Sequence, residues 1–216
     1  MTLERKEKEK EQRRNTIIDA AQALFFAKPY DEITIEAIAE KAQLAKGTVY
    51  LYFNSKEEVY SAVALRGSRI LNRMLKENVE GKKNGLEKAF ATGEAYYQFS
   101  KEYQEYFRMF SEAENLDLCS SCKTSQELFV VSNENLEVVL NAVTEGERDG
   151  SIRPDLDPKL TAIFLIQSTK SMIELTPGFE RFLKKTGTDK DVIVGFALQA
   201  LRQSLQNNRN EKVGEP

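Results

Sequence analysis

The sequence predicts an all-α fold of about nine helices, and three observations support that prediction. Long segments of the 216-residue chain repeat apolar residues at helical spacing, and only five prolines interrupt them. Apolar residues make up 41% of the chain, which is ordinary for a globular protein. No apolar run approaches the roughly 20 residues that a membrane-spanning helix needs. We therefore expect helices throughout and no membrane partner.

Charged residues open the chain, with acid and base alternating from Glu4 to Arg14. Such a run is typical of a solvated helical extension or a frayed end. The alternative is a basic arm that reaches a DNA backbone, with Arg13 and Arg14 as its contacts. The segment also lacks the apolar core of a secretory signal, so we expect a cytoplasmic protein.

A first packed helix is expected from about Gln12 to Phe26. Its apolar residues recur at steps of three and four, which places them on one buried face. These residues are Ile17, Ala20, Ala21, Leu24 and Phe25. Pro29 follows and ends the helix, because proline cannot continue one. This helix would brace the two that come next.

Two short helices separated by a tight turn follow the proline. Thr34 is a good N-cap for the first, because its hydroxyl can accept a hydrogen bond from a free backbone amide. The turn falls at Gln43 and Leu44, and the second helix runs from Ala45 to about Tyr52. This is the helix-turn-helix arrangement, in which the second helix lies in the DNA major groove.

A capping box marks the start of a long fourth helix. Ser55 and Glu58 have the S-x-x-E spacing, in which each side chain bonds the other residue's backbone amide. We expect this helix to begin at Lys56 and to run to about Glu80, where a glycine-containing segment ends it. A helix of this length can connect two domains.

The run A-K-G-T-V-Y-L-Y-F-N-S-K-E-E-V-Y at residues 45–60, preceded by T-I-E-A-I-A-E-K-A-Q-L, closely resembles the DNA-binding signature of the tetracycline-repressor (TetR) family of bacterial regulators. The likeness covers roughly residues 12–65. It implies a homodimeric, ligand-responsive transcriptional repressor that a small effector releases from a palindromic double-stranded DNA operator. The implied domains are an arm and helix-turn-helix domain at 1–60, a connecting helix at 61–81, and an effector-binding and dimerisation domain at 82–216.

The expected DNA contacts follow from the groups that suit phosphates and base edges. Helix N-termini attract phosphate, so Thr34 and Lys56 would grip the backbone. Lys46 can donate to guanine, Gly47 allows close approach, and Tyr50 can pack on a thymine methyl. The full set, whose motif positions the family uses in this way, is Thr34, Lys46, Gly47, Thr48, Tyr50, Leu51, Tyr52 and Lys56. Alternatively, the tyrosines only pack the small domain.

Two positions depart from the family pattern. Ala45 stands where many members carry a polar residue, so a cap or phosphate contact is missing there. Glu36 stands where some members carry a base-reading cation, and it would either accept from a cytosine amino group or repel the DNA backbone. Residues 1–60 hold ten Lys or Arg against eleven Asp or Glu, so affinity depends on where the cations lie.

Aromatic residues between Phe90 and Phe110 allow two interpretations. At helical spacing they are typical of a core, yet bundle cores also hold apolar pockets. The TetR resemblance implies an effector in this domain, which suggests a lipophilic or aromatic ligand. Its expected contacts are Tyr97, Phe107, Phe110, Leu136 and Phe164.

Three more helices are expected, at about residues 126–147, 158–175 and 189–206. The last two carry apolar stripes and can form a four-helix interface between two subunits. The expected interface residues are Ile163, Phe164, Ser171, Val192, Phe196 and Gln199. Alternatively, these stripes only close the core of one subunit.

Histidine does not occur in the chain. A Ser-His-Asp triad, a Cys-His pair and any His-bearing zinc site are therefore excluded, and we expect no enzyme, catalytic residue, metal or cofactor. A helical ligand carrier or enzyme with a vestigial DNA-binding domain is the alternative from another class. Cys119 and Cys122 form a single C-x-x-C pair, interpreted as reduced thiols or as the switch of a redox-responsive regulator.

Overall fold

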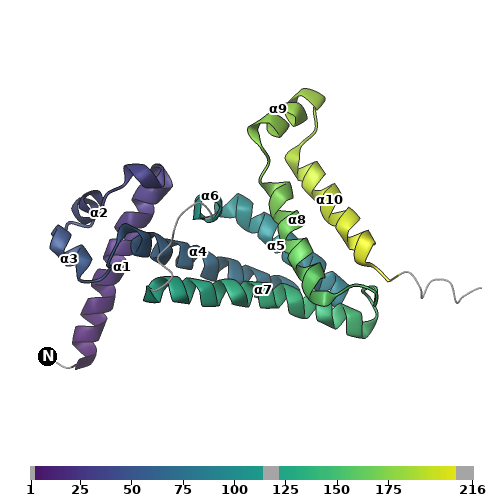
Figure 1. The fold of residues 1–216 in the computed structure, drawn as a ribbon, viewed down its shortest axis with the longest axis horizontal. Helices are drawn as coiled ribbons and strands as arrows, with labels where there is room; N and C mark the ends of the chain where they lie inside the picture. The colour runs from purple at the N-terminus through teal and green to yellow at the C-terminus, as the bar shows by residue number, and fades with distance from the viewer. Residues whose placement is uncertain (1–2, 114–121, 208–216) are drawn as a thin grey trace, which may run out of the picture. The chain divides into compact units, whose positions relative to one another are not determined.

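In the computed structural model, which describes residues 3–113 and 122–207, the chain forms ten α-helices and one short 3-10 helix (Figure 1). The all-α prediction is confirmed. Within these residues, extended backbone pairs only in one isolated bridge, between Ile152 and Gln206. None of the described helices is both long and apolar enough to cross a membrane.

Contacts divide the chain into two compact units. The first comprises Met1–Arg69 and Tyr103–Val131, and the second comprises Ile70–Glu102 and Ser132–Pro216. Two long helices, α4 (Lys56–Val79) and α7 (Lys123–Asp149), contribute residues to both units. The sequence suggests a different division, by function, into residues 1–60, 61–81 and 82–216. That division stays a prediction.

The first unit is built on α1 (Leu3–Ala27), which begins well before the predicted start at Gln12. Its early turns are exposed, and Arg5 donates to Glu9 at 3.0 Å. These turns are the solvated helical extension that the alternating charges favour. The unit also contains η1 (Tyr30–Glu32), α2 (Ile35–Lys41), α3 (Lys46–Tyr50) and α6 (Gln104–Ala113).

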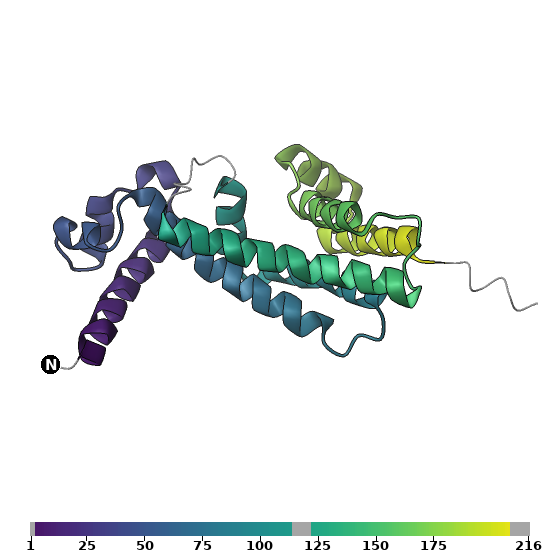
Figure 2. The same ribbon diagram turned by 60° about the horizontal axis from the view of Figure 1, so that its bottom comes forward.

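The second unit is a helical bundle. It contains α5 (Gly85–Glu102), α8 (Pro158–Ile173), α9 (Pro177–Thr186) and α10 (Lys190–Leu205). Helices α8 and α10 pack on α5 and on each other (Figure 2). Where α5 begins, a Cβ on Gly85 would lie 1.9 Å from the backbone nitrogen of Gly146 in α7. Only glycine permits this close crossing of the two helices.

Helix α9 was not predicted from the sequence. The predicted helices at 158–175 and 189–206 leave a gap that contains Thr176-Pro177-Gly178, and in the structure this segment starts α9. Thr176 accepts a hydrogen bond from the Phe179 amide at 3.3 Å, and Pro177 takes the first helical position. Gly187 ends the helix in the left-handed conformation, with φ of 69°. The start and stop signals were therefore present in the sequence.

Candidate DNA-binding surface and ligand cavity

The candidate DNA-binding surface is formed by α2, α3 and the turn between them. Thr34 caps α2 as predicted, accepting a hydrogen bond from the Ala37 amide at 3.2 Å. Gln43 makes the turn in the left-handed conformation, with φ of 56°. Ala45 precedes α3 without a side-chain cap, as its methyl group requires. Local sequence chemistry thus sets both helix starts.

Helix α3 presents most of the predicted DNA contacts to solvent. Lys46 and Gly47 are exposed, Tyr50 is 47% exposed and Leu51 is 80% exposed, while Thr48 and Tyr52 are partly covered. The side chains that hold the helix in place are buried, and they are Val49 and Phe53. The exposed side chains and the unobstructed backbone at Gly47 leave this face free to approach a base-pair edge.

Lys46 is not a free cation in this structure. Its ammonium group pairs with the carboxylate of Glu36 in the first turn of α2, and it lies 5.8 Å from the ring centre of Tyr50. The hydrogen bond from Lys46 holds the pKa of the Glu36 carboxyl below its ordinary value, and the same bond raises the pKa of Lys46. Lys46, which was expected to donate to a base, is therefore already paired with a carboxylate of the same domain.

Lys56 opens α4, as predicted, but its ammonium group turns back onto the protein. The Nζ atom donates to the Tyr30 carbonyl oxygen at 3.0 Å and lies 3.9 Å from the Tyr30 ring centre. Tyr30 in turn donates to Glu57 Oε1 at 2.6 Å. Lys46 and Lys56, the two lysines expected to contact DNA, therefore both have partners within the first unit.

The capping box before α4 is only half of the expected pattern. The Glu58 amide donates to Ser55 Oγ at 3.3 Å, as predicted. The Glu58 carboxylate, however, accepts from the backbone amide of Asn54 at 2.8 Å instead of that of Ser55. One of the two arginines expected as arm contacts also has partners within the protein: the Arg14 guanidinium lies 5.1 Å from the Phe53 ring centre and donates to Thr124 at 3.3 Å.

A cavity of about 340 Å³ lies within the second unit. Its wall is mostly aliphatic and comes from α4, α5, α7, α8 and α10. Six neutral polar residues interrupt that wall: Thr92, Tyr96, Ser132, Asn135, Gln167 and Thr169. Arg202 near the end of α10 adds one cation. This composition suits a lipophilic molecule with one polar end.

Of the five residues expected around an effector, only Leu136 lines this cavity. Phe107 and Phe110 belong to α6 in the first unit. Tyr97 lies on α5 and donates to Asp191 of α10. Phe164 is on the exposed side of α8. The sequence did not reveal Leu71, Leu75 or Arg202 as wall residues, because five helices have to pack before they meet.

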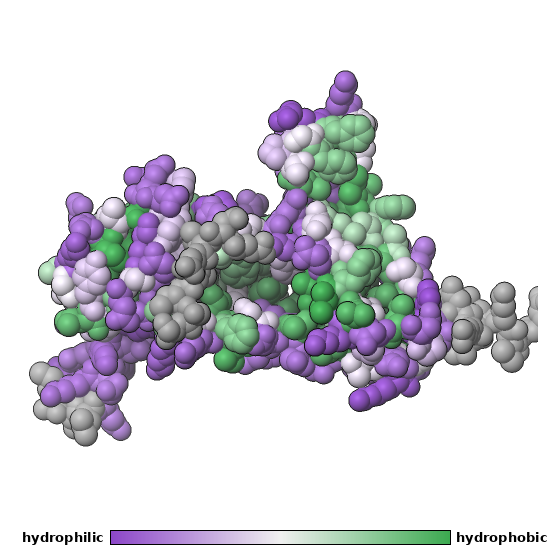
Figure 3. All heavy atoms as spheres, in the orientation of Figure 1, coloured by the Kyte–Doolittle hydropathy of each residue, from purple (hydrophilic) through white to green (hydrophobic). Residues whose placement is uncertain are grey.

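The predicted dimer residues lie on α8 and α10, and all six are exposed. Phe164 is 54% exposed and Phe196 is 76% exposed. Further apolar side chains are exposed on the same helices and on α9: Leu160, Ile166, Phe179 and Phe182. Figure 3 shows hydrophobic side chains gathered over this part of the second unit. Contiguous exposed apolar patches of this kind usually mark a surface that binds another molecule.

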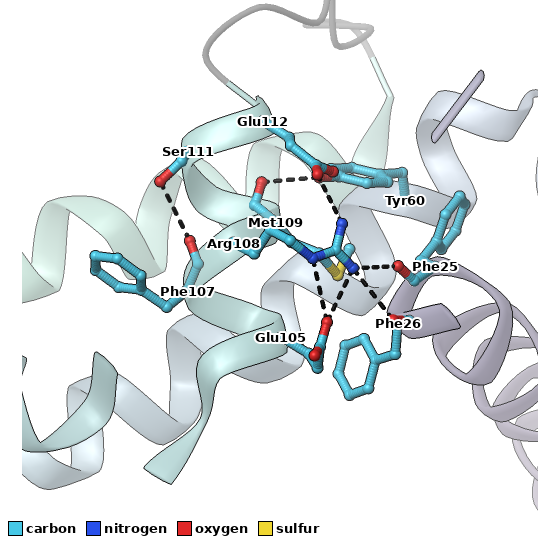
Figure 4. A network of polar contacts seen from close by, with 9 residues as sticks. All are labelled: Phe25, Phe26, Tyr60, Glu105, Phe107, Arg108, Met109, Ser111 and Glu112. Carbon is cyan, nitrogen blue, oxygen red and sulfur yellow. Dashed lines mark hydrogen bonds and ion pairs between the residues drawn. The ribbon is translucent and has the colours of Figure 1, made fainter. Parts of the chain in front are cut away.

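Arg108 of α6 joins the last turn of α1 to two acidic residues of its own helix (Figure 4). Its Nη2 atom donates to the carbonyl oxygen of Phe25 at 2.7 Å. Glu105 and Glu112 accept from the same guanidinium at 2.9 and 2.6 Å. The cation thereby satisfies a carbonyl at a helix C-terminus, where positive charge is favourable.

The chain is similar to known bacterial regulators. Residues 17–63 match the model of bacterial regulatory proteins of the tetR family. The fatty acid metabolism regulator protein of Bacillus subtilis (strain 168) is 30% identical over 161 residues, which cover 71% of this chain and 77% of the relative. The chain belongs to the TetR family of bacterial regulatory proteins. It is a DNA-binding transcriptional regulator, as the motif at residues 45–60 predicts.

Two further similarities extend over nearly the whole chain. The transcriptional repressor DhaR of Mycobacterium sp. (strain GP1) is 25% identical over 209 residues, or 92% of this chain and 96% of that one. The crystal structure of the regulator FadR from Bacillus subtilis in complex with stearoyl-CoA has a TM-score of 0.66 at 20% identity, covering 88% of this chain and 98% of the other. The latter likeness shows the fold.

The redox interpretation of the cysteine pair stays a prediction, because Cys119 lies outside the described residues. Cys122, just before α7, is buried in the first unit of this TetR-family regulator.

We expect Glu36→Gln to raise DNA affinity at physiological salt by roughly three- to tenfold and to steepen the salt dependence by about one counter-ion. The substitution removes an exposed negative charge and releases Lys46 to the DNA. Filter binding between 50 and 200 mM salt measures both quantities, and Glu94→Gln in α5 is the control with the same charge change. A loss of affinity confined to the operator would contradict this expectation and make Glu36 a base-reading residue.

Proposed function

We propose that this regulator is a cytoplasmic homodimeric repressor that occupies a palindromic operator and leaves it when a lipophilic effector enters the cavity of the second unit. The observation that carries the proposal is the combination of an exposed recognition helix α3 with a largely aliphatic cavity in the same chain. The fatty-acid regulator relative and the structural likeness to a stearoyl-CoA complex support an alkyl-chain effector.

Dimerisation is supported by the exposed apolar side chains of α8 and α10. Two such helices from each subunit form a four-helix interface, which has two-fold symmetry. A two-fold protein places its recognition helices about one turn of DNA apart, roughly 34–36 Å, or somewhat farther, and so reads an inverted repeat.

Two connections along the chain support a route from cavity to DNA. Helix α4 starts at Lys56, and later supplies Leu71 and Leu75 to the cavity wall. Helix α6 follows α5 directly, and Arg108 fixes it to the last turn of α1. An effector that changes how α4 and α5 pack would thereby alter the separation of the recognition helices, provided that it binds the two states with different affinity.

Selection from random DNA tests the proposed operator. The full chain should enrich sequences with two inverted half-sites, and these should bind at least about 1,000-fold more tightly than random DNA at physiological salt. Enrichment of no sequence, or of a single half-site, would count against a homodimeric repressor.

A further inference from the structure

Arg202 occupies an unusual position in the second unit. It lies in the last turn of α10, where it lines the cavity and is only partly exposed. Its guanidinium carbon is 5.4 Å from the ring centre of Phe90, another residue of the cavity wall. The aromatic face supports the cation in this position but does not neutralise it.

Several cations of the second unit are paired with carboxylates, whereas Arg202 is not. Lys88 lies 2.6 Å from Glu145, and Lys101 lies 3.1 Å from Asp191. Within residues 3–113 and 122–207, Arg202 forms no ion pair, and it is the single charged residue among those that line the cavity. A cation drawn partly out of water has a free-energy cost that a nearby anion offsets.

The rest of the wall fits the remainder of such a ligand. Leucine, isoleucine and valine side chains supply most of the surface, and the polar groups among them are neutral hydroxyls and amides. Resting on the function proposed above, we infer that the cavity takes an apolar chain that ends in a compact oxyanion, and that Arg202 pairs with that oxyanion. A carboxylate and a phosphate share this chemistry.

A structural role for Arg202 is the competing explanation. Positive charge near the end of α10 favours the helix, and stacking on Phe90 holds the bundle together. Under that explanation Arg202→Gln would lower the melting temperature and would weaken all ligands alike. The two explanations differ in whether Arg202 distinguishes a charged ligand from an uncharged ligand of the same chain length.

Calorimetric titration of the full chain without DNA provides the test, with decanoate, decyl phosphate and decan-1-ol as ligands. Wild type should bind decanoate or decyl phosphate at least about tenfold more tightly than decan-1-ol, because a charge-assisted hydrogen bond adds to the same chain burial. The tighter of the two anions identifies the oxyanion.

Arg202→Gln should abolish that tenfold preference and leave decan-1-ol binding within twofold of wild type. Arg202→Lys, which keeps the charge, should retain part of the preference. Arg153→Gln, which removes a cation paired with Asp155 at 2.6 Å outside the cavity, should retain all of it.

Equal binding of all three compounds to wild type would overturn the role of Arg202 and leave the proposed repressor function standing. A preference that survives Arg202→Gln would overturn it as well. Failure of every decyl compound to bind would remove both the inference and the proposed lipophilic effector. Tight anion binding in a protein that selects no operator would remove the repressor function alone.

Discussion

Introducing charge into the exposed face of α8 and α10 is expected to convert the protein from dimer to monomer and to lower operator affinity at least about 100-fold. The change is the double substitution Phe164→Glu and Phe196→Glu. Both rings are more than half exposed in one subunit, so the subunit itself should keep its fold. The operator affinity falls because two linked recognition helices bind far more tightly than one.

Light scattering after gel filtration and fluorescence anisotropy with operator DNA measure the two effects. Phe129→Glu is the matched control, because Phe129 is 67% exposed but lies on α7 in the first unit. Circular dichroism should show unchanged helix content in all variants. A double variant that stays dimeric and keeps its operator affinity would show that the subunits associate through another surface.

Replacing Arg108 with methionine is expected to destabilise the first unit by about 2 kcal/mol, a fall of roughly 8–16 °C in its melting temperature. The substitution leaves the Phe25 carbonyl oxygen without its donor and leaves Glu105 and Glu112 without their cation. The ion pairs themselves contribute little, because the arginine side chain is partly exposed. Most of the loss comes from the helix end.

The same substitution should weaken the response to an effector. Arg108 hydrogen-bonds α6 to the last turn of α1. Ligand binding in the cavity should therefore persist while ligand-induced release from DNA becomes smaller. Arg5→Met is the control, since Arg5 pairs with Glu9 on the exposed part of α1 without contacting a backbone carbonyl. If Arg108→Met kept the wild-type melting temperature and the wild-type response, Arg108 would neither stabilise the first unit nor transmit the effector signal.

Local signals in the sequence were enough to predict the helix-turn-helix. Thr34 caps its helix through its own hydroxyl, and Val49 and Phe53 are buried as their spacing requires. Such features depend on residues within one or two turns of each other. Helix α9 depends on the same kind of signal, with Thr176 as its N-cap and Pro177 at its first position, but the predicted helices left residues 176–188 between them.

Features that join distant parts of the chain were not predicted. The pair between Glu36 and Lys46 spans two helices, so the sequence showed each charge but not their contact. The cavity needs five helices to pack, and spacing along one helix does not show which side chains line a space between several. Of these lining residues the sequence predicted Leu136 as a ligand contact, but it did not predict Arg202.

The central claim is that a ligand in the cavity of the second unit lowers DNA affinity, and one titration tests it most directly. Fluorescence anisotropy of the operator complex is followed while each decyl compound is added to wild type and to Leu136→Trp, whose larger ring fills the cavity. Phe129→Trp, on the exposed side of α7 in the first unit, is the control.

We predict that at least one compound lowers the operator affinity of wild type and of Phe129→Trp by about 5- to 150-fold. Leu136→Trp should bind the operator as wild type does and should not respond to the same compound. Operator affinity that stays constant in wild type while the compound is bound would contradict the account, and so would an equal response from Leu136→Trp.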